Sequence, residues 1–202
     1  MRKKSHISLA RHIVAISGMQ SFEKHKKAFY VGSVLPDCKP SFITKRHEIT
    51  GTFDLVEHGI EKLTQGYREI GELSTAYFTR LGEIVHYIAD YFTFPHNKEY
   101  QGSMKQHCIY EGELKRALRS YIQNIRLNDL QRWRTELKID DLAGFHNTVD
   151  ICNFLKEEHG KYIHKENHSM QEDLKYIVGV CSRAVMAILH VCTLAFYKDC
   201  TV

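Results

Sequence analysis

The chain has 202 residues, of which 43% are hydrophobic and 26% charged, as in soluble globular proteins. This composition excludes a disordered, collagen-like or coiled-coil chain and predicts one compact domain over residues 1–202. The formal net charge of +4 is too small and too evenly spread to indicate nucleic-acid binding. The 13 histidines are more informative, because histidine is the commonest metal ligand.

Apolar residues recur at helical spacing, and only three prolines interrupt the chain, which predicts an all-α, single-domain multi-helix bundle. The first two expected helices cover residues 7–18 and 22–32, with Ser5 as the N-cap of the first. Residues 36–51 contain two prolines and are expected to form a loop or a short irregular helix. A connection of this length is often functional.

Six further helices are expected after this segment. The second of them, over residues 74–93, is apolar on most sides, which indicates a buried central helix. Two starts carry a capping-box pattern, Ser103 with Gln106 and Ser169 with Glu172. The six expected ranges are 53–66, 74–93, 104–125, 128–137, 147–164 and 170–198.

The six cysteines include no C-x-x-C pair, and several lie in apolar helical stretches, so we expect free thiols. The N-terminal apolar stretch is interrupted by Arg11 and two histidines, which argues against a secretory signal. The most apolar segment, residues 177–197, carries Arg183 and His190, so we expect a buried core helix and no transmembrane segment. These features predict a cytoplasmic protein and leave its oligomeric state open.

Histidines and carboxylates occur four residues apart at two places in the chain. His86 and Asp90 share one face of the expected central helix, and His107 and Glu111 repeat the arrangement further along. His96 lies between the pairs, after a proline where a helix should end. One such pair is usually a surface ion pair, but two pairs with a histidine between them favour a metal site.

His96, His107 and Glu111 could form a zinc site with a water molecule, because zinc binds imidazole nitrogen and carboxylate oxygen. The pair on the central helix would need ligands from elsewhere, and the long loop and the first helix supply candidates. The eight candidate ligands are His6, Asp37, His47, His86, Asp90, His96, His107 and Glu111. This number suffices for more than one metal ion.

Five segments carry these residues: SHISLARHIV, GSVLPD, RHE, HYIADYFTFPH and HCIYE. In these segments and their order, the chain resembles the zinc-dependent phospholipase C family, which shares an all-helical fold with the trinuclear zinc nucleases. The resemblance runs from His6 to about Leu114. It implies two or three zinc ions per chain and hydrolysis of a phosphodiester.

The resemblance also implies how the ligands are shared between the zinc ions. One ion would be held by the loop and the central helix, through Asp37, His47, His86 and Asp90. A second would be held by His96, His107 and Glu111. A third would use His6 and share Asp90 as a bridge.

Secreted family members complete the third site with the amine and carbonyl of an N-terminal tryptophan. This chain begins with Met1, and its one tryptophan is Trp133. Met1 precedes His6 by the spacing found in the nuclease branch, so we hypothesise that the Met1 amine is the substitute ligand. The spacing from Asp90 to His96 is instead similar to that found in the phospholipase branch.

By this resemblance, water activated by zinc would attack a phospholipid or a related small phosphodiester. Asp37 would be the catalytic residue that orients or deprotonates this water. Two alternatives stay open: a zinc-dependent single-strand nuclease or nucleotidase, which needs an aromatic platform for base stacking, and a non-catalytic zinc-binding protein. Candidates for an apolar wall around a lipid substrate, or for ordinary core packing, are Tyr87, Tyr91, Phe92 and Phe94.

Overall fold

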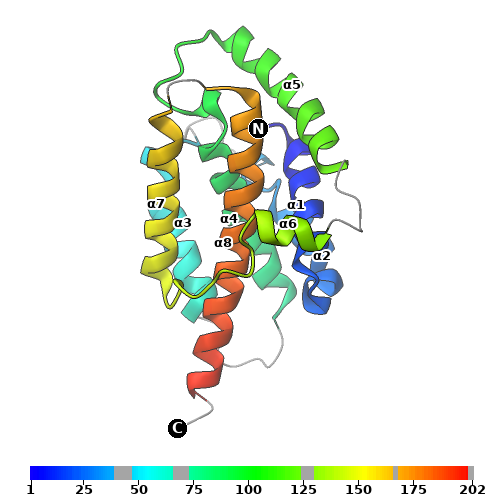
Figure 1. Cartoon of the computed structure of the whole chain (residues 1–202), viewed down its shortest axis with the longest axis vertical. Helices are drawn as coiled ribbons and strands as arrows, with labels where there is room; N and C mark the ends of the chain where they lie inside the picture. Colours follow the sequence, from blue (N-terminus) through cyan, green and yellow to red (C-terminus); the bar gives the residue numbers. More distant parts are fainter. Residues whose placement is uncertain (39–46, 66–72, 124–129, 166–167, 200–202) are drawn as a thin grey trace.

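The structure is a computed structural model that describes residues 1–38, 47–65, 73–123, 130–165 and 168–199. The secondary structure of these residues is helical and contains no strand, so the predicted all-α multi-helix fold is confirmed (Figure 1). The α-helices are α1 (Lys3–Ser17), α2 (Gln20–Gly32), α3 (Ile49–Gln65), α4 (Thr75–Tyr91), α5 (Met104–Gln123), α6 (Leu130–Glu136), α7 (Thr148–Ile163) and α8 (Met170–Asp199). Two 3₁₀ helices, η1 (Pro36–Cys38) and η3 (Phe94–His96), follow α2 and α4.

Some helix boundaries differ from the predicted ones. The prediction that Ser5 caps the first helix is wrong, because α1 begins at Lys3 and Ser5 is buried within it. The Met1 side chain is only 4% exposed and anchors the chain ahead of the helix, which allows the earlier start. α3 begins at Ile49, ahead of the expected residue 53. Residues 39–46 of the expected loop and residues 128–129 lie outside the described residues.

The two predicted capping patterns both occur at helix starts. At α5, the Ser103 N–H donates to Gln106 Oε1 at 2.7 Å, and the Gln106 N–H donates to Ser103 Oγ at 3.3 Å. At α8, Ser169 Oγ accepts from the Glu172 N–H at 3.3 Å, while the Glu172 carboxylate forms ion pairs with two lysines. These bonds satisfy backbone donors that a helix start otherwise leaves unpaired.

α8 is the helix around which much of the fold is organised. It runs along most of the molecule and packs against α1, α3, α4, α5 and α7 (Figure 1). Among the described helices, it alone is long and apolar enough to cross a membrane, over Met170–Ala195, but 67% of the window tested is buried within the protein. This burial agrees with the expected core helix, and Arg183 packs its guanidinium over the rings of Phe145 and Phe154.

α2 and α4 approach each other closely because glycines lie at their contact. A Cβ atom at Gly32 would lie 1.9 Å from the carbonyl oxygen of Thr79, and one at Gly82 would lie 2.4 Å from that of Phe29. Larger residues at these positions would force the two backbones apart. The close approach brings the Ser33 carbonyl within reach of α4.

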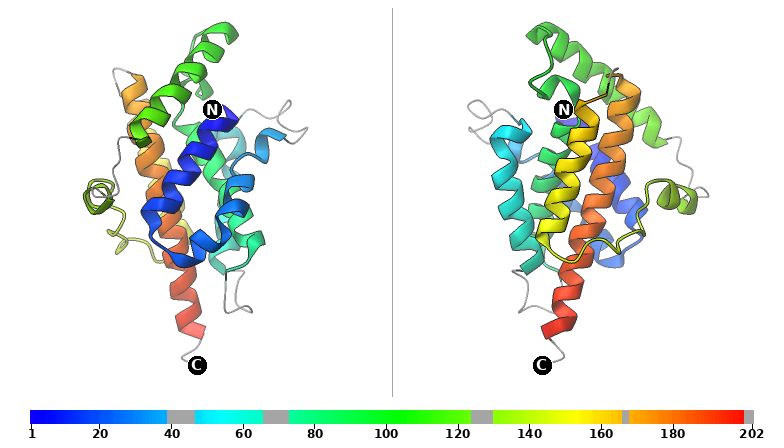
Figure 2. Two further views of the ribbon diagram at one scale, coloured as in Figure 1. Left: turned by 90° about the vertical axis from the view of Figure 1, so that its right-hand side faces the viewer. Right: turned by 60° about the vertical axis from the view of Figure 1, so that its left-hand side comes forward.

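Several element ends lie at one end of the molecule. Figure 1 shows the N-terminus and α5 toward the end opposite the C-terminus, and both views in Figure 2 show the same arrangement. The start of α1, the end of α4, η3 and the start of α5 therefore bring residues that are distant in sequence into one region.

We expect Gly32→Ala to destabilise the protein by about 1–3 kcal/mol, because the added methyl group would clash with backbone atoms of α4. Urea unfolding followed by circular dichroism measures this effect. Gly160→Ala in α7 is the matched control, since a Cβ atom there has open space. The control should leave stability unchanged or raise it by up to about 1 kcal/mol. Equal unfolding free energies for the two variants would contradict the packing argument.

Candidate metal centre

The eight predicted ligands meet at this end of the molecule. α1, η1 and the segment just before α3 each supply one, and α4, η3 and α5 supply the others. In chain order these are His6, Asp37, His47, His86 with Asp90, His96, and His107 with Glu111. Their nitrogen and oxygen atoms form groups in which all members lie within 4.8 Å of one another.

The first group surrounds one carboxylate oxygen of α4. Asp90 Oδ2 lies 3.0 Å from His47 Nδ1 and 3.4 Å from His86 Nε2. His86 Nε2 lies 3.1 Å from His47 Nδ1 and 3.5 Å from Asp37 Oδ1. A tetrahedral zinc ion with bonds of about 2.1 Å holds its ligand atoms about 3.4 Å apart. The spacings of His47, His86 and Asp90 therefore fit one zinc ion, while Asp37 lies next to this group and forms another with His6 and His86.

The other oxygen of Asp90 faces His6. His6 Nε2 lies 3.5 Å from Asp90 Oδ1, and the imidazole stacks on His86 with ring centroids 3.9 Å apart. Within the described residues, neither ring nitrogen of the buried His6 has a hydrogen-bond partner. A buried polar group without a partner is costly, and a metal ion would satisfy this one. The surroundings of His6 thus fit a ligand to a further ion.

The Met1 amine lies between the ligand groups. Its nitrogen is 2.5 Å from Asp90 Oδ1, 3.0 Å from His96 Nε2 and 3.3 Å from Glu111 Oε1. Burial opposes charge on this amine, but the carboxylates of Asp90 and Glu111 raise its pKa above the ordinary value. The amine thus lies nearest to Asp90 of the implied third site and also within 3.3 Å of two ligands of the group from η3 and α5.

The second group, from η3 and α5, is more open. Glu111 Oε1 lies 3.2 Å from His96 Nε2 and 3.4 Å from His107 Nε2. The side chains of His96, His107 and Glu111 are 13%, 23% and 17% exposed. Three protein ligands with an open side are typical of catalytic zinc sites, whereas structural sites are closed.

Burial sets the protonation state of two buried candidate ligands, His86 and His6. It lowers the pKa of His86 to about 4, and burial together with the neighbouring His86 lowers the pKa of His6 well below the usual value. A neutral imidazole offers a nitrogen lone pair to a metal ion. Burial and the charge of Asp90 raise the pKa of Asp37 to about 6. His86 and His6 are therefore in the neutral form that binds metal.

A backbone carbonyl orients the His86 ring. His86 Nδ1 donates to the Ser33 carbonyl oxygen at 2.9 Å, so Nε2 carries the lone pair and faces the other ligands. This support could not be predicted from the sequence, because a backbone acceptor leaves no signal in residue type. The glycines between α2 and α4 were the available sign, since they allow the close approach.

A buried carboxylate outside the ligand set supports the second group. Asp173 in α8 is 0% exposed and accepts hydrogen bonds from the Phe94 N–H at 3.0 Å, the Tyr110 hydroxyl at 2.8 Å and the Tyr162 hydroxyl at 2.7 Å. Burial raises its pKa, although these donors act in the opposite direction. Phe94 begins η3, which carries His96, and Tyr110 immediately precedes the last ligand. α8 therefore fixes η3 and α5 relative to each other.

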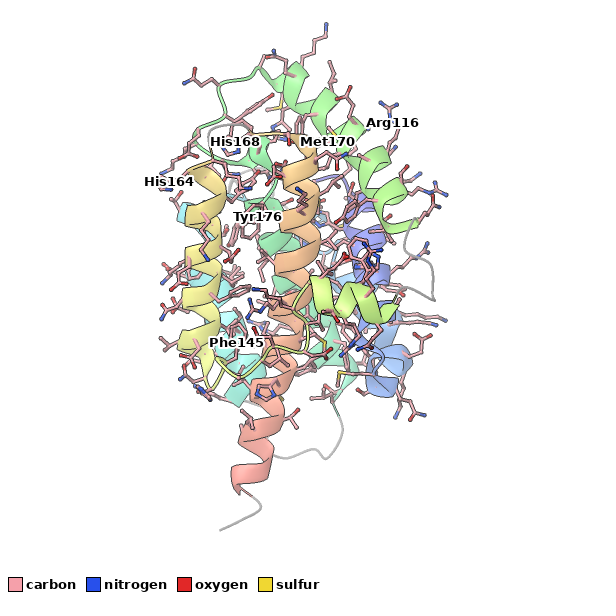
Figure 3. The ribbon with its side chains drawn as sticks, in the orientation of Figure 1. Arg116, Phe145, His164, His168, Met170 and Tyr176 are labelled. Atoms are coloured by element: carbon pink, nitrogen blue, oxygen red, sulfur yellow. The ribbon has the colours of Figure 1, made fainter. Side chains whose placement is uncertain are left out.

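α7 supports η3 as well. Asn97, next to the ligand His96, donates to the carbonyl oxygens of Tyr91 and Thr93, each at 3.1 Å, and pairs with His159 Nε2 at 2.9 Å. His168, which is labelled in Figure 3, stacks on Phe94 with ring centroids 4.0 Å apart. No sequence motif in this half of the chain predicts such a role. A buried aspartate at the start of an apolar helix was the available sign.

The ligands border a pocket of about 680 Å³. Five of them contribute to its lining, so they are accessible from it: Asp37, His47, His96, His107 and Glu111. Of the two possibilities left open for Tyr87, Tyr91, Phe92 and Phe94, the structure favours core packing, because the described lining includes none of them. Phe92 packs instead against Tyr162 and Tyr176 in the core.

We expect Asp173→Asn to lower the zinc affinity of the second group by about 10–100-fold, the usual effect of losing a residue that orients metal ligands. Competition with a chromogenic chelator measures zinc affinity, and circular dichroism confirms that the variant is folded. Asp141→Asn, at an exposed position, is the matched control. Zinc affinities that match the control would show that Asp173 does not support the metal centre.

The comparison with protein families agrees with this geometry. Residues 5–169 match the zinc-dependent phospholipase C family, a span that includes all eight candidate side-chain ligands. No match is found among curated proteins or among solved structures. The histidine and carboxylate groups fit zinc binding, and the match covers far more than half of the sequence. The chain therefore belongs to the zinc-dependent phospholipase C family.

Proposed function

We propose that this protein is a zinc-dependent phosphodiester hydrolase of the phospholipase C type. The observation that carries the proposal is a cluster of eight candidate zinc ligands, five of which line a pocket. The substrate class is a phospholipid or a related small phosphodiester, and the cofactor is two or three zinc ions per chain. Membership of the family supports the proposal of hydrolase activity.

Zinc ions bound here would neutralise phosphate oxygens and lower the pKa of a bound water. Asp37 in the pocket lining orients the attacking water and accepts its proton. The water oxygen bonds to phosphorus, the bond from phosphorus to the leaving oxygen breaks, and the proton passes to that oxygen. His96, His107 and Glu111 hold the phosphate side of the pocket. Asp37 is thus the proposed catalytic residue.

The small-phosphodiester proposal has more support than the nuclease alternative. A single-strand nuclease needs aromatic faces on which bases stack. In the described part of the pocket lining, Tyr100 is the one Phe, Tyr or Trp side chain. A metal-binding protein without turnover would not need the open side that His107 and Glu111 leave toward the pocket.

We expect His86→Ala to lose at least one zinc ion per chain and to lower turnover of bis(p-nitrophenyl) phosphate by about 10³-fold or more, because removing one preorganised electrostatic group already costs about 10²–10³-fold. Inductively coupled plasma mass spectrometry and a p-nitrophenol assay provide the two measurements. His58→Ala, on the exposed side of α3, is the matched control. Full turnover by the His86 variant would refute the assignment of the first group.

A second prediction concerns the Met1 amine. We expect residues added before Met1 to lower the zinc count by one ion per chain, since the amine nitrogen lies 2.5 Å from Asp90 Oδ1 and an amide nitrogen cannot replace it as a ligand. The same residues added after Val202 are the control. Elemental analysis of both proteins gives the result, and an unchanged count in the N-terminally extended protein would dispose of the Met1 hypothesis.

A further inference from the structure

Charged side chains that are not candidate ligands surround the mouth of the pocket. Three are basic, Arg2, Lys3 and Lys98, and one is acidic, Glu48. The other carboxylates in the lining, Asp37 and Glu111, belong to the metal centre. Apart from the ligands, positive charge therefore exceeds negative charge in the described lining of the pocket.

The position of Arg2 is fixed by α5. Its Nη2 donates to the Cys108 carbonyl oxygen at 2.8 Å. The same nitrogen would lie 3.4 Å from a Cβ atom at Gly112, so the guanidinium lies against the helix where that glycine leaves room. A guanidinium has five N–H donors, and the described bond uses one. The remaining donors can serve an anion in the pocket.

Lys3 and Lys98 place charge on two further segments of the wall. Lys3 lies in the first turn of α1, and Lys98 follows η3. Lys3 and the proposed catalytic residue Asp37 line the same pocket, so Lys3 borders the space in which a substrate would bind.

This lining suits an anionic group and not a quaternary ammonium. A choline group is recognised by aromatic faces and by carboxylates. The described lining offers one tyrosine, Tyr100, and one carboxylate outside the ligand set, Glu48, which already interacts within the protein. The phosphodiester itself carries one negative charge, which the metal centre would neutralise. The three basic residues are thus available for a second anion.

Building on the hydrolase proposed above, we propose that this pocket selects phosphodiesters that carry a second phosphate group and disfavours choline phosphodiesters. The reacting phosphate lies at the metal centre, and the second phosphate contacts Arg2, Lys3 and Lys98 at the mouth. Guanidinium and ammonium groups both bind phosphate through charge-assisted hydrogen bonds.

The test separates binding from turnover. Three p-nitrobenzylphosphonate monoesters, in which a P–C bond replaces the scissile bond to p-nitrophenol, are titrated into the zinc-loaded protein by isothermal calorimetry. They are identical except for a terminal phosphate, hydroxyl or trimethylammonium group. We expect the phosphate compound to bind at least about 10-fold more tightly than the hydroxyl compound, with the trimethylammonium compound weakest. The preference should fall with added salt. Equal affinities, or tightest binding of the trimethylammonium compound, would overturn the proposal.

The double variant Lys3→Gln with Lys98→Gln should reduce the ratio of phosphate to hydroxyl affinity by about 10-fold. Lys105→Gln is the control, because this exposed lysine of α5 is not part of the lining. A ratio that the double variant leaves unchanged would contradict the role of the two lysines.

Turnover is measured on the matching p-nitrophenyl phosphodiesters. If none is hydrolysed while the binding preference holds, the hydrolase proposal fails and the inferred selectivity stands. Diacylglycerol and glycerol esters of the phosphate-bearing head group, the first in mixed micelles and the second in solution, then distinguish a lipid source from a soluble one.

Discussion

A buried negative charge at Asp90 is the constraint on which the rest of the site depends. Burial opposes its ionisation, yet the Met1 ammonium and the ring of His96 hold its pKa well below the usual range. Removing such a carboxylate from water costs several kcal/mol unless cations and hydrogen-bond donors surround it. Its two oxygens divide the neighbours between them, with His47 and His86 near one, and Met1 and His6 near the other. The position of this one carboxylate explains why chain segments so distant in sequence converge.

The helical scaffold holds these groups in place by backbone contacts as well as by side chains. The glycines between α2 and α4 let the two helices approach closely, and the Ser33 carbonyl then fixes the His86 ring. Ligands on packed helices keep their spacing better than ligands on loops, and preorganised spacing is what a metal centre requires. Packing of the helices in the described part of the molecule therefore contributes to the proposed chemistry indirectly, because it holds the ligands at their spacing.

The sequence predicts local features of this fold well and long-range ones poorly. Helical periodicity gives all eight α-helices, and the pair at Ser103 and Gln106 gives the start of α5, because both signals depend on neighbours along the chain. Ligand identity also follows, since imidazoles and carboxylates keep their spacing within each motif. The support from Asp173 does not follow, because its partners are far away in sequence and one of them is a backbone N–H. The role of the aromatic residues near the site stayed open for a related reason, since periodicity does not distinguish an aromatic side chain that faces a pocket from one in the core.

The bonds of Asp173 to η3 and α5 also bear on the order in which the protein is assembled. Every candidate ligand lies before residue 112, but the carboxylate that aligns two of the ligand segments is in the last helix. During synthesis, the ligand-bearing helices leave the ribosome well before α8 exists. The second ligand group can then reach its final geometry only when the chain is almost finished, which predicts that this group binds metal after α8 has folded and does not nucleate folding.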